Sequence, residues 1–481
     1  MWHNRVIVAA AFAALAGCNM APPHNVPALP VSGEYMPETA PGGTGGDIVA
    51  TDWKGFFKDE RLLQLIDMAL ANNRDLRVAV ARIDEAKAQY RIQRTDELPQ
   101  LNGSAGAIRS QTPTSAQDTI DSYNIGVGVS AFELDFWGRV HNLSEAARAR
   151  YLGTVAAERA FRLSLIRDLA TAYVTSRSLA EQADEADRAI VSREYGLKIA
   201  KLRLDAGVTS AVDYRQAETL LTQAQTQSAA LRNQRVQQRN IIRLAMGAPI
   251  DEETLAPARK LDDQQIFQAI DAGLPSALLV NRPDIIEAEE NLRAARADIG
   301  AARAAFFPSI SLTGQFGFES TDLDNLFSSA SRSWSFGPAI NLPIFDWGAR
   351  NGNLDLARAR EVIQIATYEK TVQTAFREVS DALANRRYLV EQIEAQERAV
   401  EGNRELARIS RLRYDNGVTN YLQVLDAERN LFSAQQELIQ LRGQELSSVI
   451  TLYAALGGGL GSPSPARTGD AVPAATVQPR P

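Results

Sequence analysis

The spacing of apolar residues is helical over two long stretches of the chain. From Gly138 to Leu204, apolar and small residues recur at intervals of three and four without a proline, which predicts one continuous helix with a coiled-coil spacing. At ~1.5 Å per residue, this helix would be on the order of 100 Å long. After a short turn, a second helical pattern runs from Ala211 to Met246. The two stretches together predict a long helical hairpin.

Two other stretches alternate between apolar and small or polar residues, which is the period of β-strands. The first predicted hairpin covers residues 98–136 and the second covers residues 307–345. Within the first, Phe132, Leu134 and Phe136 take the opposite parity to the preceding strand. This change predicts a bulge or the exit of the chain into the next helix. Each hairpin has one apolar face, as transmembrane β-hairpins do.

The second half of the chain repeats the first at an offset of about 210 residues. Phe307-Pro308 corresponds to Leu98-Pro99, Trp347-Gly348 to Trp137-Gly138, and Leu456-Gly457 to Met246-Gly247. We therefore predict an internal duplication. Residues 53–250 form the first repeat, residues 251–271 a linker, and residues 272–457 the second repeat.

Two similar segments stand at the predicted tips of the helical hairpins. Residues 203–210 read Arg-Leu-Asp-Ala-Gly-Val-Thr-Ser, and residues 413–420 read Arg-Tyr-Asp-Asn-Gly-Val-Thr-Asn. A glycine after a helix is typical of a tight turn, and a turn that only reverses the chain is the simpler interpretation of either copy. Because the arginine and Gly-Val-Thr recur in both copies, we expect the tips to contact a partner. The predicted contact residues are Arg203, Gly207, Val208, Thr209, Arg413, Gly417, Val418 and Thr419.

The N-terminus has the features of a secretory signal with a lipidation site. A short charged region precedes an apolar run from Val6 to Ala16, which is too short to span a bilayer as a helix. Leu15-Ala16-Gly17-Cys18 then has the form of a lipobox. We predict that residues 1–17 are removed and that Cys18, the only cysteine, is lipidated. The alternative is an ordinary signal peptide with an incidental cysteine. Asn19, rather than aspartate, resembles the sorting pattern of lipoproteins sent to the outer membrane.

Two segments outside the repeats have compositions that do not favour regular structure. Residues 18–52 are rich in proline and glycine, which predicts an extended tether. Residues 458–481 are rich in glycine, proline, alanine and serine, and we predict that this tail is disordered. Beyond the signal, no window of 18 or more apolar residues predicts a transmembrane helix.

The composition offers little for metal or covalent chemistry. The chain of 481 residues has three histidines and one cysteine, and its formal net charge of −7 gives no basic patch for nucleic acid. Only His24 and His141 would remain in the mature chain, and no nucleophile motif or phosphate-binding glycine loop is present. We therefore expect neither an enzyme nor a cofactor or metal site.

The four predicted strands constrain how the chain can assemble. Four strands do not close on themselves, and open sheet edges are not tolerated in lipid. Three chains would supply twelve strands, a number that closes into a barrel with a water-filled interior. The predicted fold class is therefore mainly α with a β-barrel part: a trimeric twelve-stranded transmembrane barrel continued by a coiled-coil helical barrel. A periplasmic coiled-coil scaffold is the alternative, but it would not explain the strands.

The chain resembles the TolC-like outer membrane efflux proteins, in particular their lipoprotein (OprM-like, NodT) branch, over about residues 50–460. The resemblance rests on the lipobox, both tips, Phe132-Glu133-Leu134-Asp135-Phe136-Trp137-Gly138-Arg139, Leu342-Pro343-Ile344-Phe345-Asp346-Trp347-Gly348, and Asn420-Tyr421-Leu422-Gln423-Val424-Leu425-Asp426-Ala427-Glu428-Arg429. It implies a lipid-anchored homotrimeric channel of the outer membrane with a large periplasmic extension. Such a channel docks onto a periplasmic adaptor and an inner-membrane pump of the RND type, and it expels drugs or other toxic solutes. Type I protein secretion and metal efflux are the alternatives within this class.

One helix face near the second tip carries charges that the first half lacks. Leu422, Asp426 and Arg429 lie at i, i+4 and i+7, whereas the matching positions of the first half are Val212, Gln216 and Thr219. A solvated face with a weak ion pair is the simpler interpretation. The resemblance implies that these positions form the periplasmic constriction, where three Asp426 side chains would approach one axis. We therefore predict a periplasmic gate made by Leu422, Asp426 and Arg429.

Overall fold

The computed structural model describes residues 19–27, 31, 46–47, 52–111, 119–249, 251, 261, 270–271 and 282–458. The predicted signal peptide, Cys18, and most of the predicted tether, linker and tail lie outside these residues. The chain divides into two compact units. Unit 1 comprises Met1–Pro30, Val80–Ala157 and Asp284–Thr371, and unit 2 comprises Val31–Ala79, Glu158–Pro283 and Val372–Pro481. Each unit thus takes segments from both sequence repeats, because neither repeat buries its apolar faces alone.

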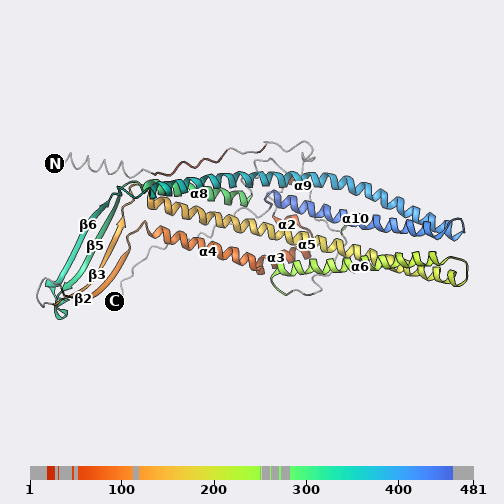
Figure 1. Ribbon diagram of the computed structural model, residues 1–481, viewed down its shortest axis with the longest axis horizontal. Coiled ribbons are helices and arrows are strands. Elements are labelled where there is room, and N and C mark those ends of the chain that lie inside the picture. Colours follow the sequence, from red (N-terminus) through yellow and green to blue (C-terminus); the bar gives the residue numbers. More distant parts are fainter. Residues whose placement is uncertain are drawn as a thin grey trace. The chain divides into compact units, whose positions relative to one another are not determined.

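Unit 1 contains one antiparallel sheet of four strands in the order β2-β3-β5-β6 (Figure 1). The strands are β2 (Leu101–Gln111), β3 (Thr119–Glu133), β5 (Ser309–Ser320) and β6 (Arg332–Asn341). β3 pairs with β5, with Tyr123 opposite Ser320, so the two repeats meet in the middle of the sheet. A Cβ atom on Gly126 would lie 2.9 Å from the Phe316 carbonyl oxygen, so a side chain there would not allow this close pairing.

β3 contains the irregularity that the change of parity predicts. Its register against β5 shifts between Val129 and Phe132, and Ala131 has φ 52°. The Ala131 amide donates to Thr313 Oγ1 at 3.1 Å instead of joining the ladder. The bulge therefore turns Phe132 and the residues after it to the other face of the sheet.

The helices repeat at the same offset as the sequence. The long helices are α5 (Arg139–Asp205) and α9 (Ala349–Asp415), of 67 residues each. The shorter ones are α4 (Arg74–Thr95), α6 (Ala211–Met246), α8 (Pro283–Ala304) and α10 (Tyr421–Ala455). The predicted internal duplication is confirmed, because α8, α9 and α10 begin about 210 residues after α4, α5 and α6. Among the described residues, no helix has both the length and the hydropathy that a membrane span requires.

The main apolar core of unit 2 joins two short helices to the long ones. α2 (Trp53–Phe56) and α3 (Glu60–Asn72) pack against α5, α6, α9 and α10. Phe56 stacks on Tyr453 of α10 with ring centres 4.0 Å apart. Asp59, the N-cap of α3, accepts a hydrogen bond from Tyr173 Oη of α5 at 2.8 Å, and Arg177 donates to the same hydroxyl at 2.7 Å. One face of α5 is therefore committed to this core.

The smallest elements complete the described chain. β1 (Gly46–Asp47) and β4 (Ile270–Asp271) form a parallel pair. Two short 3-10 helices, η3 (Leu323–Asn325) and η4 (Ser329–Ser331), lie in the connection between β5 and β6. They place no candidate site residue.

Residues 19–27 pack against α8 within unit 1. Arg303 Nη1 donates to the Met20 carbonyl at 3.1 Å, and Arg296 Nη1 donates to the Asn25 carbonyl at 2.6 Å. A Cβ atom on Gly300 would lie 2.8 Å from Ala21 Cα, so the glycine allows the segment to cross the helix closely. This part of the predicted tether is therefore held on the protein surface.

Candidate functional site

Both tips end their long helix with the same hydrogen-bonded cap. In the first, Val208 N donates to the Arg203 carbonyl at 3.0 Å and Gly207 N donates to the Leu204 carbonyl at 2.9 Å. The second has the same two bonds, at 2.8 and 2.9 Å, and Gly207 and Gly417 both have φ 73°. This is the Schellman arrangement, in which a left-handed residue ends the helix. The turn itself therefore requires both predicted glycines.

The residues after each glycine start the return helix, but by different means. Ser210 caps α6 with a capping box, in which its hydroxyl accepts from Asp213 N at 3.3 Å. Thr209 Oγ1 also donates to the Asp213 carboxylate. At the second tip, Asn420 Oδ1 accepts from Gln423 N at 3.4 Å. Thr209 is thus used by the local turn.

The predicted tip residues differ in how far they are available to a partner. Val208 and Val418 stand at the position where this turn commonly carries an apolar residue, yet they are 72% and 65% exposed. Arg203 lies over the Tyr414 ring, with Cζ 4.6 Å from the ring centre, and donates to its hydroxyl. Arg413 is exposed. Among the predicted tip residues, the side chains that are exposed to solvent are therefore those of Val208, Val418 and Arg413, whereas Arg203 links the two hairpins.

Behind the tips, α6 and α10 line a groove of about 540 Å³. The three predicted gate residues lie on it, and Arg429 Nη2 is 3.0 Å from Asp426 Oδ1. The matching residues of the first half line the same groove: Val212, Gln216 and Thr219. Both copies of this helix face thus contribute to one surface.

Arg215 is a groove residue that sequence reasoning missed. It projects from α6 into the groove and pairs with Glu218 Oε2 at 2.6 Å. Its matching residue in the second half is the uncharged Leu425, so the charged positions of the second half do not indicate it. Its spacing of four residues from Ala211 and Thr219 is the signal that would have found it.

A cluster of partly buried charges joins the four helices of unit 2 behind the groove. Arg411 Nη1 of α9 lies 3.6 Å from Glu428 Oε1 of α10. Arg193 Nη1 of α5 donates to the Leu220 carbonyl of α6 at 2.8 Å and lies over Phe432. Burial raises the pKa of Glu428, and the two arginines partly offset this rise. Because its members come from four helices, no spacing within one helix predicts this cluster.

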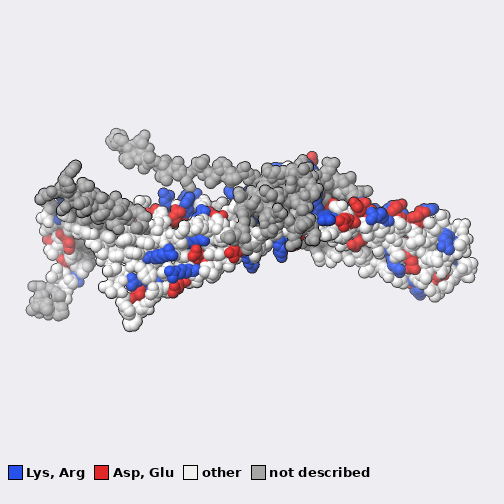
Figure 2. All heavy atoms as spheres, turned by 90° about the horizontal axis from the view of Figure 1, so that it is seen from above, with Lys and Arg blue, Asp and Glu red and all other residues white. Residues whose placement is uncertain are grey.

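The face seen in Figure 2 shows no single patch of one charge that would indicate another site. Acidic and basic side chains are interspersed on the face seen in Figure 2. The described residues contain no group of three or more side chains suited to hold a metal ion.

These features define a class of protein: a duplicated chain of long helical hairpins with a sheet whose outer strands come from different repeats. The sequence model of the family described as outer membrane efflux protein matches residues 65–248 and again residues 274–458. The chain belongs to this family. It is an outer membrane component of an efflux system.

Relatives of known name cover almost the whole chain. The solvent efflux pump outer membrane protein SrpC of Pseudomonas putida is 42% identical over 454 residues, covering 92% of this chain and 96% of its own. The outer membrane protein OprJ of Pseudomonas aeruginosa is 40% identical, covering 92% and 94%. Among solved structures, the open state of the Neisseria gonorrhoeae MtrE outer membrane channel has a TM-score of 0.85 at 38% identity, covering 92% of this chain and 99% of MtrE.

Proposed function

We propose that three copies of this chain form a passive conduit across the outer membrane. The observation that carries this proposal is the sheet, whose outer strands β2 and β6 are the ends of a four-stranded array. Unpaired backbone groups are costly in lipid, so β6 of one copy would pair with β2 of the next. Three copies then give a closed barrel of about twelve strands, a size that leaves an aqueous interior.

The exposed side chains of the sheet support its position in the membrane. Trp334, Phe336 and Ile340 of β6 alternate with serine, glycine and alanine, and they are 74%, 66% and 70% exposed in the single chain. An outward apolar row that alternates with small residues is the pattern of a lipid-facing strand.

The tips are the surfaces that we assign to a periplasmic adaptor. Val208 and Val418 offer two small apolar contacts, with Arg413 beside one of them. A contact of this size is small for a stable interface, so docking would need several tips at once, as a trimer provides.

The solutes that we assign to the conduit follow from its relatives. SrpC is named for solvent efflux, and the relative ArpC of Pseudomonas putida, 41% identical, is named as an antibiotic efflux pump protein. We assign the chain to export of antibiotics or organic solvents through an RND-type pump. Protein secretion and metal efflux are the alternatives.

The groove behind the tips is the position that we assign to the gate. In a trimer, three Asp426 carboxylates would approach one axis, and Arg429 at 3.0 Å would offset their repulsion.

Lipidation of Cys18 would add a membrane anchor to a barrel that inserts by itself. Replacement by Cys18→Ser behind an ordinary signal should therefore still give trimers in the outer membrane.

Two measurements test this function together. The purified protein in planar bilayers should give ohmic single-channel conductance, whereas a scaffold lipoprotein would give none. A strain that lacks the gene should become more susceptible to antibiotics and solvents, and the full chain should restore its tolerance. Sensitivity to metal ions alone, or loss of a secreted protein alone, would favour one of the alternatives.

A further inference from the structure

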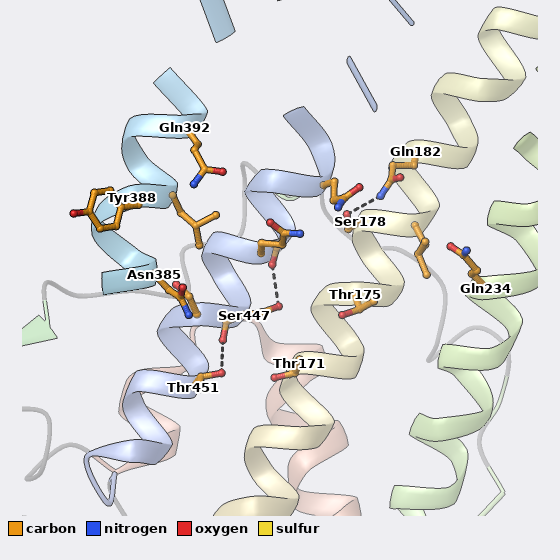
Figure 3. A pocket seen from close by; sticks show the side chains of 16 residues that line it. Thr171, Thr175, Ser178, Gln182, Gln234, Asn385, Tyr388, Gln392, Ser447 and Thr451 are labelled. Carbon is orange, nitrogen blue, oxygen red and sulfur yellow. Dashed lines mark hydrogen bonds between the residues drawn. The ribbon is translucent and has the colours of Figure 1, made fainter. Parts of the chain in front are cut away.

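A second concavity, of about 830 Å³, lies among α5, α6, α9 and α10 in unit 2 (Figure 3). All of its lining residues are uncharged, although about 23% of the chain is charged. The polar ones carry hydroxyl groups, such as Thr175 and Thr451, or amide groups, such as Gln392 and Gln444. A wall of this size without any charged residue is therefore an unusual feature in a chain of this composition.

Two arginines near the concavity contact residues outside it. Arg442 of α10 pairs with Glu397 of α9 at 2.9 Å. Arg177 of α5 donates to Tyr173 in the core that holds α3. Neither arginine is among the residues that line the concavity.

The concavity lies on the side of α5 and α10 opposite the main core. On α5, Leu169 and Tyr173 belong to the core, and Thr175 lies two residues further along. On α10, Val449 belongs to the core and Thr451 lines the concavity. Since two residues correspond to about 200° of rotation on a helix, the two faces point in opposite directions.

The floor of the concavity is closed by hydrogen bonds within the chain. A Cβ atom on Gly443 would lie 2.9 Å from Ser178 Oγ, so this glycine lets α10 approach α5 closely. Gln182 Nε2 donates to Ser178 Oγ at 3.1 Å, and Gln436 Nε2 donates to the Gln182 carbonyl at 2.9 Å. The floor is therefore a fixed polar seam.

The walls differ from the floor, because several of their amides are open. No hydrogen bond joins the side chains of Asn385, Gln392 or Gln444 to another residue of the described chain. Each amide offers both a donor and an acceptor. Tyr388, 48% exposed, adds an aromatic surface beside them.

From this arrangement we infer that the concavity is a weak binding site on the conduit wall for uncharged, drug-sized solutes rich in hydroxyl or amide groups. The inference rests on the proposed function, since it takes this side of the helices as the inner wall. Each hydrogen bond to an amide replaces one to water and gains only a modest net free energy, so solutes would be retained only briefly. Without fixed charge, this section would also not discriminate between cations and anions.

The test uses the full-length trimer in planar bilayers, with chloramphenicol as the probe because it is uncharged and carries an amide, hydroxyl groups and an aromatic ring. The wild type should show brief, concentration-dependent interruptions of current. Gln392→Ala with Gln444→Ala should raise the half-blocking concentration roughly fivefold for each amide removed. The control pair, Gln225→Ala with Gln227→Ala, removes exposed amides of α6 outside both concavities and should leave the block unchanged.

A charge placed on the wall gives an independent reading. Gln444→Glu should shift the reversal potential in a salt gradient toward cation preference, and Gln444→Lys should shift it toward anion preference. If the double alanine variant does not form trimers, Thr175→Val with Thr451→Val removes two wall hydroxyls at nearly constant volume.

The outcomes separate this inference from the proposed function. If the wild type gives no ohmic conductance, the proposed conduit itself is wrong. If it conducts, but block and reversal potential are the same in all wall variants as in the wild type, the binding site is wrong and the conduit stands.

Discussion

The two helical hairpins, α5–α6 and α9–α10, share their lengths and turns but differ in chemistry at matched positions. Both glutamates at one matched position are half-buried, but Glu218 pairs with Arg215 of its own helix, whereas its counterpart Glu428 lies near Arg411 of another helix. Leu204 of the first tip corresponds to Tyr414, which holds Arg203. The turn is thus repeated closely, as is the ion pair between the two helices of each hairpin, Arg232 with Asp187 and Arg442 with Glu397. Tyr414 and Glu428 of the second hairpin contact arginines of other helices, whereas among the described residues their counterparts Leu204 and Glu218 do not.

The exposed valines test whether the repeated tips act on a partner. Val208→Asp with Val418→Asp should abolish efflux in cells, because charge replaces both small apolar contacts while the glycine caps remain. Drug susceptibility and crosslinking to the adaptor would measure this loss. A matched change on an exposed helix position of α6, Gln227→Asp, should have no effect. Full efflux by the double valine variant would remove the tips from docking.

The gate comparison predicts the next largest effect. Asp426→Ala with Arg429→Ala should raise single-channel conductance severalfold. The double variant removes both charged residues of α10 that line the groove, and these residues form the proposed constriction. The matched pair of the first half, Gln216→Ala with Thr219→Ala, should change conductance much less. Equal effects in both halves would show that the charges do not make the constriction.

The contact between the hairpins can be removed by making the second tip resemble the first. Tyr414→Leu should destabilise the hairpin pair by about 1 kcal/mol, since it removes the cation–π contact and the hydrogen bond with Arg203. Thermal unfolding would measure the change. If Arg203→Ala in the Tyr414→Leu background costs as much again as it does alone, the two residues do not act as a pair.

Half-buried Glu428 predicts a small, pH-dependent effect on stability. A carboxyl group whose pKa is raised on folding favours the folded state while protonated, and this contribution is lost as the pH rises through the raised pKa. Glu428→Gln should therefore raise the thermal midpoint at neutral pH and lose this advantage in acid, where Glu428 is neutral as well. Glu218→Gln at the matched position of α6 is the control. An advantage that persists unchanged in acid would contradict the assignment.

The repeating parts of this fold could be predicted from the sequence because their signals are local. The three-and-four spacing predicted a helix from Gly138 to Leu204, and α5 runs from Arg139 to Asp205. The change of parity at Phe132 predicted the irregularity in β3, because strand faces alternate strictly. Both relations involve residues that are close together in one element.

The contacts between elements could not be predicted in this way. Arg203 was predicted to contact a partner, and nothing in the sequence around it indicates that it also packs on Tyr414, which is 211 residues away. The burial of Glu428 depends on which sides of four helices meet, and spacing within α10 does not determine this. The packing of residues 19–27 on α8 likewise depends on Arg296, Arg303 and the gap at Gly300.

The central claim is that the sheet is closed between copies, and a crosslink between its outer strands tests this claim most directly. Cys18 is the only native cysteine, and it does not interfere once it is acylated or replaced. One cysteine is introduced in β2 and one in β6, so that a disulfide reports on the pairing of these two strands. Suitable pairs combine Ser104→Cys in turn with Ser333→Cys, Ser335→Cys and Asn341→Cys. The account predicts that at least one pair forms disulfides in membranes and yields linked species of up to three chains. If every pair gave only single chains, while the protein remained folded in the outer membrane, closure of the barrel between copies would be contradicted.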